Sequence, residues 1–104
     1  MKRPVARLAG AAMAVVAMTP GLASTFCPIP NTRDGFVALR AGPDLKAPIV
    51  ARMRQGDEIQ AMSEQSGPWI RARYWRGDER LTRGFGRHRA TGWVHRSLVA
   101  DLCG

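Results

Sequence analysis

The sequence is short of acidic residues, cysteines and long apolar runs, and each shortage excludes a class of protein. Its 104 residues include 8 Asp+Glu against 16 Lys+Arg, for a formal net charge of +8. No apolar run reaches the roughly 20 residues that a membrane-spanning helix needs. A chain this short cannot build a Rossmann or (β/α)8-barrel enzyme, so we expect one small domain.

The acidic shortage is greatest at the start, where the first 23 residues have the composition of an export signal. Three basic residues precede an apolar stretch over residues 8–18, and Gly21 and Ala23 fit the small-x-small rule for cleavage after Ala23. A membrane anchor is the alternative, but the stretch is too short to span a bilayer. A lipoprotein is disfavoured because Cys27 does not directly follow the small residues. We therefore expect a bacterial protein that is periplasmic or secreted.

The two cysteines, Cys27 and Cys103, stand near the two ends of the predicted mature chain. Disulfides persist in exported proteins, so we predict a bridge between them. For a loop this long, the chain-entropy model gives about 4 kcal/mol of stabilisation. A catalytic thiol with His88 or His95 as its base would need a cleft and a third orienting group. A zinc site from these four residues lacks CxxC or HxxxH spacing, so we expect no metal and no cofactor.

Short apolar runs separated by Gly and Pro turns indicate an all-β domain. Residues 24–35 are rich in turn formers and predict an extended lead-in, and residues 97–102 predict one helical turn. The clearest strand, WIRARYW, alternates, which places Ile70, Ala72 and Tyr74 on one face. The pattern is typical of a small barrel or sandwich. The five predicted strands span residues 36–40, 48–53, 58–63, 69–75 and 93–95.

Five short motifs follow one another in a fixed order along residues 36–99. They read LRAGP at 39–43, PIV at 48–50, GDEI at 56–59, GPWIR at 67–71 and TGWV at 91–94. Together they resemble the bacterial SH3-like (SH3b) domain, whose members typically open on leucine-arginine-x-glycine-proline and close on glycine-tryptophan-valine. The resemblance implies a small five-stranded SH3-like barrel over residues 36–104. It also implies a non-catalytic binding module rather than an enzyme.

Residues 76–92 depart from this family, which usually joins its fourth and fifth strands by a short hairpin. This stretch holds five Arg against two acidic residues, and residues 71–96 hold eight Arg against two. We therefore predict a long basic hairpin or loop insert before the last strand. Long loops in compact domains are commonly functional. The alternative is a solvated ribbon that Leu81 and Phe85 pack against the barrel.

Most aromatic residues gather in the same basic stretch. On the alternating strand, Trp69 and Trp75 share the face opposite Ile70, and Trp93 lies opposite Val94. We expect these tryptophans to face outward or line a groove, Trp69 first among them, although each could instead cap the core. Arginines interleaved with aromatic rings hold anionic or extended ligands. The candidate ligand-binding residues are Trp69, Arg71, Arg73, Trp75, Arg83, Arg87, Arg89 and Trp93.

The predicted compartment selects among partners for this basic surface. Nucleic acid would bind it by counterion release, but an exported protein lies outside the compartment that contains nucleic acid. We hypothesise a binding module for peptidoglycan or another cell-envelope component. An inhibitor or assembly subunit that contacts a periplasmic protein through residues 76–92 is the alternative, and contact with an anionic membrane surface stays open. A small hydrolase is disfavoured, because adjacent acidic pairs such as Asp57 and Glu58 do not converge.

Overall fold

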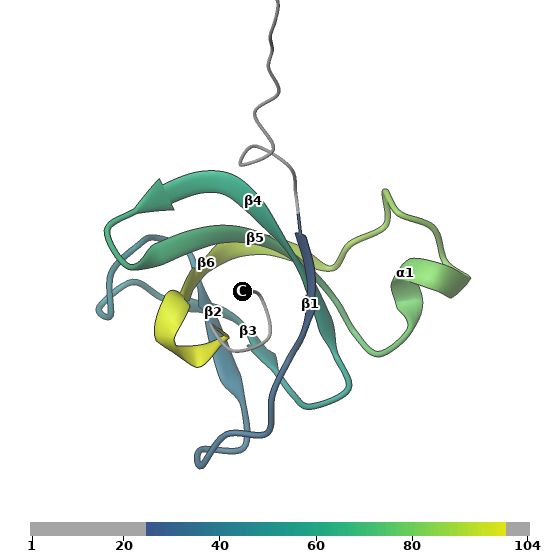
Figure 1. The fold of residues 1–104 in the computed structure, drawn as a ribbon, viewed down its shortest axis with the longest axis horizontal. Helices are drawn as coiled ribbons and strands as arrows, with labels where there is room; N and C mark the ends of the chain where they lie inside the picture. The colour runs from purple at the N-terminus through teal and green to yellow at the C-terminus, as the bar shows by residue number, and fades with distance from the viewer. Residues whose placement is uncertain (1–24, 100–104) are drawn as a thin grey trace, which may run out of the picture.

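In the computed structural model, which describes residues 25–99, six antiparallel strands form one sheet in the order β1-β4-β5-β6-β2-β3. The sheet curls around a single interior (Figure 1). The strands are β1 (Thr25–Pro28), β2 (Val37–Arg40), β3 (Ile49–Met53), β4 (Glu58–Ser66), β5 (Trp69–Trp75) and β6 (Ala90–His95). A short helix, α1 (Glu79–Thr82), stands between β5 and β6, and a 3-10 turn (Arg96–Leu98) follows β6.

The all-β prediction is confirmed, and five of the six strands lie within three residues of their predicted bounds. The longest hairpin joins β4 and β5, paired from Glu58↔Trp75 to Ser66↔Trp69 with an irregularity in between. Gly67 makes the tight turn with φ of +56°, a conformation that most other residues resist. The predicted helical turn begins one residue early, at Arg96.

The expectation of five strands is wrong, because the predicted lead-in contains a sixth. β1 pairs with β4 in the register Thr25↔Ala61 to Pro28↔Glu58. Proline is tolerated there because β1 is an edge strand, and only one of its sides needs backbone partners. The predicted signal over residues 1–23 lies outside the described residues, as does Cys103.

The core fills the interior of the curled sheet, and each of the six strands contributes at least one buried apolar side chain to it. Fully buried members include Val37, Leu39, Met53, Ile59 and Val94. The alternation predicted for β5 is confirmed on this side, since Ile70, Ala72 and Tyr74 all belong to the same buried cluster. The buried Cys27 joins them from β1, and Val99 joins them from beyond the 3-10 turn.

Gly92 allows β6 to approach β2 closely, where Arg40 pairs with Trp93. A Cβ atom at Gly92 would lie 2.5 Å from the Arg40 carbonyl oxygen and 2.9 Å from the Cγ of Leu39. Only glycine fits such a contact without displacement of the backbone.

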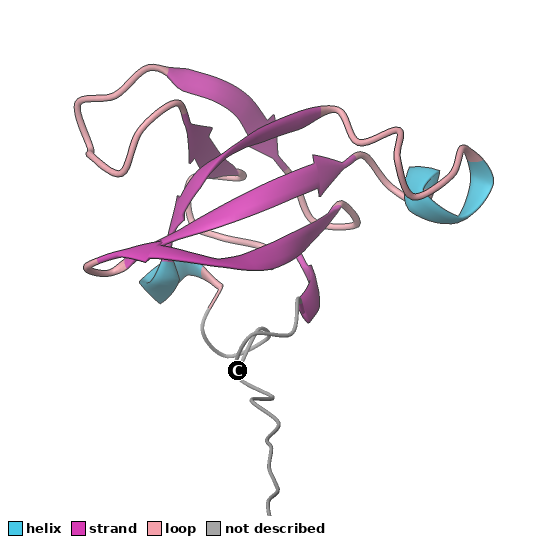
Figure 2. Ribbon diagram, turned by 90° about the horizontal axis from the view of Figure 1, so that it is seen from above, coloured by secondary structure: helices cyan, strands magenta, loops and turns pink. Residues whose placement is uncertain are grey.

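The segment between β5 and β6, residues 76–89, projects from one end of the barrel (Figures 1 and 2). We call it the cap. It contains α1 and is shorter than the predicted insert, because residues 90–92 belong to β6. Within the described part of the chain, no helix has the length and apolar character to cross a membrane.

Candidate functional site

Asp57, in the turn between β3 and β4, fixes the start of the cap to the barrel. One carboxylate oxygen, Oδ2, accepts hydrogen bonds from the Tyr74 hydroxyl and the Arg54 amide, and Oδ1 accepts one from the Gly77 amide, each at 2.9 Å. A buried carboxylate with three donors is well satisfied. Burial raises the pKa of Tyr74, so its hydroxyl keeps its proton and donates at neutral pH.

Two bidentate ion pairs hold the rest of the cap. The Arg80 guanidinium contacts Glu58 on β4 at 2.7 and 3.2 Å, and Arg89 contacts Glu79 at 2.8 and 2.6 Å. Parallel hydrogen bonds of this kind fix geometry better than a single contact does. The hydrogen bonds from Arg89 are the main reason why the pKa of Glu79 is lowered to about 2. The first ion pair therefore anchors α1 of the cap to β4, and the second connects α1 to the last residue of the cap, Arg89.

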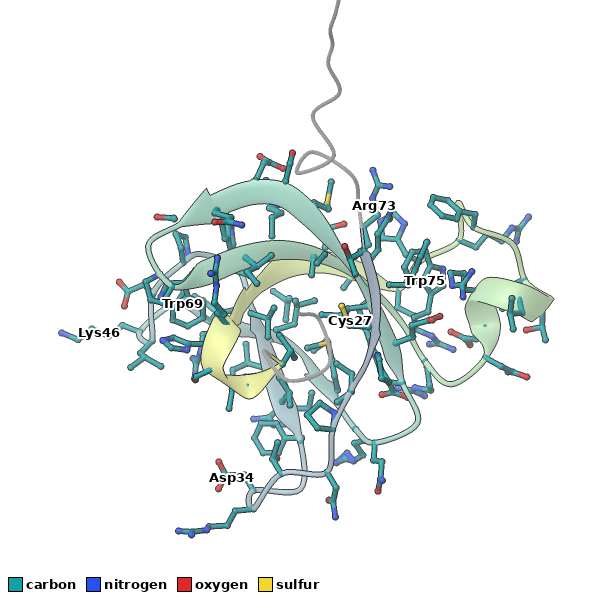
Figure 3. All side chains as sticks on the ribbon, in the orientation of Figure 1. Cys27, Asp34, Lys46, Trp69, Arg73 and Trp75 are labelled. Atoms are coloured by element: carbon teal, nitrogen blue, oxygen red, sulfur yellow. The ribbon has the colours of Figure 1, made fainter. Side chains whose placement is uncertain are left out.

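A small aromatic cluster lies under the cap, on the outer face of β5. Trp75 has 0% of its surface exposed, and its ring centroid lies 6.0 Å from that of Phe26 and 5.7 Å from that of Phe85. The Arg80 guanidinium sits 4.2 Å from the Phe26 ring centroid. Figure 3 shows Trp75 beside the cap. Trp75 does take the outer face of β5 as expected, but it is not exposed there, because the cap and β1 cover this end of the strand.

Trp69, at the other end of β5, is also covered. It is 7% exposed, and its ring meets the edge of His95 with centroids 5.1 Å apart. Little of the Trp69 surface is therefore open to a ligand, although Trp69 is the tryptophan expected first to face one. Nearby, the half-buried Trp93 lies with its ring centroid 5.7 Å from the Arg71 guanidinium, which also contacts Glu64 at 3.4 Å.

The eight predicted site residues thus do not form one face. Trp69 and Trp75 lie on opposite sides of the molecule (Figure 3). Arg73 lies near Trp75 and donates to Gln60 at 3.3 Å. Trp69 and Arg71 lie in the half of β5 that is away from the cap, where Trp93 on β6 pairs with Arg71.

Three of the predicted arginines do come together, in an open recess on the cap with a volume of about 390 Å³. Arg83 contacts Glu79 at 3.4 Å, whereas Arg87 has no side-chain partner within residues 25–99. Nε2 of His88 lies 3.0 Å from the Thr91 hydroxyl. Sequence reasoning did not place His88 in this site, although its position between two arginines was a signal. The lining residues are Arg83, Arg87, His88 and Arg89.

The family model for the bacterial SH3 domain matches residues 35–100. The chain belongs to this family. The resemblance seen in the turn motifs is confirmed, and membership indicates a binding module in general. No curated protein and no solved structure is similar enough to count as a match.

Two features of this bacterial SH3 domain bear on its site. β1 lies before the matched residues, yet its Phe26 completes the cluster beneath the cap. The recess carries guanidinium groups that suit an anion. Residues 25–99 hold no group of three or more His, Cys, Asp or Glu side chains that could bind a metal.

Proposed function

We propose that this SH3 domain is an exported, non-catalytic binding module that holds peptidoglycan or another acidic cell-envelope component on the basic recess of its cap. The convergence of Arg83, Arg87, His88 and Arg89 around one recess carries the proposal. The predicted export signal supports the envelope as the compartment. Acidic groups are abundant there, so opposite charge favours encounter with the cap.

The anchoring of the cap supports a binding role. Asp57 and the two bidentate ion pairs anchor the cap through contacts within the chain itself. A preformed site loses little conformational entropy when the ligand arrives, which favours affinity. Trp75 acts in this proposal as the support beneath the site, not as a contact for the ligand.

An envelope protein is the second candidate partner, with the cap as the contact loop of an inhibitor or assembly subunit. It is favoured by two apolar side chains on the cap: Leu81 is 75% exposed and Phe85 is 49% exposed. Apolar side chains at the centre of a contact surface are typical of protein interfaces.

Co-sedimentation with purified peptidoglycan sacculi tests the first candidate. The full chain is expressed, the exported form is purified, and binding is measured at low and moderate salt. We expect wild-type protein to sediment with sacculi, less so at moderate salt, and Arg87→Gln to bind less. Arg33→Gln is the matched control, because Arg33 is exposed beside Asp34, on a turn far from the cap (Figure 3), and its replacement removes the same charge.

Absence of co-sedimentation at both salt concentrations would remove peptidoglycan from consideration. The protein candidate is then tested by identifying what co-purifies with the exported form. A specific partner should be lost on Leu81→Ser, which deletes an exposed apolar contact and no charge. Retention of the partner by this variant and by Phe85→Ser would exclude the cap as its contact surface.

A further inference from the structure

We infer that the recess of the cap takes a phosphate group of the ligand in preference to a carboxylate. The inference rests on the proposed function, because it names the chemical group that the same site recognises. It also separates the recess from a generally basic surface, which would bind any acidic polymer.

The first argument is charge. Three guanidinium groups line the recess, and one carboxylate, that of Glu79, is bound to two of them, which leaves a local net charge of +2. A phosphate monoester carries a charge of about −1.5 to −2 at neutral pH. A single carboxylate carries about half of that charge, so phosphate complements the recess better.

The second argument is the availability of donors. Both parallel hydrogen bonds of Arg89 are taken by Glu79, so Arg89 shapes the recess rather than reaching for a ligand. Arg87 has no side-chain partner in the described part of the chain. Arg83 is held only by a 3.4 Å contact to Glu79, with 48% of its side chain exposed. Weak exposed pairs of this kind exchange easily, which leaves the guanidinium groups of Arg87 and Arg83 for the ligand.

The third argument is that the backbone beneath these side chains is fixed. The Arg89 amide donates to the Tyr74 carbonyl at 2.6 Å, and the Arg87 amide donates to the Gly84 carbonyl at 3.1 Å. The two available guanidinium groups, those of Arg83 and Arg87, each present a pair of N–H donors from this hydrogen-bonded loop. Such an arrangement suits an acceptor with three oxygens that point in different directions. Phosphate has that geometry, whereas the two oxygens of a planar carboxylate are matched by the paired donors of one guanidinium group.

Nuclear magnetic resonance of the 15N-labelled exported protein provides the test. Inorganic phosphate, acetate and the dicarboxylate succinate are titrated separately at constant ionic strength. We expect phosphate to shift the amide and guanidinium signals of residues 83–89 saturably, and both carboxylates to bind several-fold more weakly. Loss of one charged hydrogen-bonding partner in Arg87→Gln should weaken phosphate binding about tenfold. Arg33→Gln should leave it unchanged.

Equal or tighter binding of succinate would overturn the inference, as would phosphate shifts spread evenly over all arginines. The phosphate could belong to a lipid headgroup or to a soluble or polymeric molecule, and vesicles of phosphatidylcholine with phosphatidic acid distinguish these sources. Vesicle binding that Arg87→Gln abolishes assigns the phosphate to a lipid headgroup. Phosphate binding without vesicle binding assigns it to a soluble or polymer-borne group.

The sacculus and phosphate measurements together distinguish the failure of one proposal from the failure of the other. If sacculi retain the protein but phosphate does not bind, the proposed function stands and the phosphate assignment fails. If phosphate binds at the recess but sacculi do not retain the protein, the assignment stands and peptidoglycan is excluded.

Discussion

Gly92 is the position where one added methyl group should disturb the barrel most. A Cβ atom there would lie 2.5 Å from the Arg40 carbonyl oxygen, whereas ordinary Cβ contacts begin near 3.4 Å. The obstacle is backbone, so it cannot rotate away, and β6 and β2 must separate by about 1 Å. These two strands share a single paired position, Arg40↔Trp93, so little else in the ladder holds them together.

The expected magnitude follows from that geometry. Overpacking costs about 1–3 kcal/mol, and a weakened ladder hydrogen bond adds about 1 kcal/mol. We expect Gly92→Ala to lower the free energy of unfolding by about 3 kcal/mol, which for a domain of this size lowers Tm by about 12–24 °C. Thermal and urea denaturation, followed by tryptophan fluorescence, measures both quantities.

Gly86→Ala is the matched control for this prediction. A Cβ atom there meets nothing within 4 Å, and its φ lies outside the left-handed region. We expect a change within about 0.5 kcal/mol. If the Tm of Gly92→Ala stays within about 2 °C of that of Gly86→Ala, then β6 does not approach β2 as described and the reasoning is refuted.

Three further predictions concern the anchors of the cap and the ends of the chain. Asp57→Ala removes the acceptor of three hydrogen bonds and should lower the free energy of unfolding by about 3 kcal/mol in urea denaturation; an unchanged midpoint would contradict the anchor. The pKa of Glu79 is about 2 against an ordinary 4.5, chiefly because of Arg89, so its stabilisation is present above pH 4.5 and lost as the pH falls towards 2. Near-ultraviolet circular dichroism should show the cap loosening over that range, and Glu79→Gln should remove the dependence. If Cys27 and Cys103 are paired, protein purified from the periplasm and denatured without reductant has no titratable thiol, and reduction lowers the free energy of unfolding by about 4 kcal/mol; two titratable thiols would exclude the bridge.

β5 shows what sequence periodicity can and cannot predict. The alternation of WIRARYW correctly gives the bounds of the strand and the inward face of Ile70, Ala72 and Tyr74. It does not predict exposure on the other face, because period-two spacing says which side a residue takes and not what covers that side. Trp75 is covered by residues that are distant in sequence or lie in the cap. Which residues cover Trp75 depends on the tertiary structure, so it cannot be predicted from the local sequence pattern.

The cap was predictable in composition but not in its internal pairing. Its excess of arginine is visible in the sequence, and Phe85 does pack on the barrel side as the alternative interpretation expects. Leu81 does not, since it is largely exposed. Nor could composition tell that Arg80 and Arg89 are engaged by carboxylates while Arg87 is not, because this depends on where Glu58 and Glu79 fall in the folded chain.

The aromatic cluster beneath the cap has a consequence for hydrogen exchange. β5 separates it from the barrel core, so we expect the cap to open before the barrel unfolds, and its amides to exchange at a lower free energy of opening than those of β5. The Arg89 amide, bonded to Tyr74 across the base of the cap, reports this opening. A ligand that binds only the closed cap slows exchange at that amide by the factor 1 + [L]/Kd. Protection of one backbone amide therefore measures occupancy of the proposed site by any cell fraction, before the ligand in that fraction has been identified.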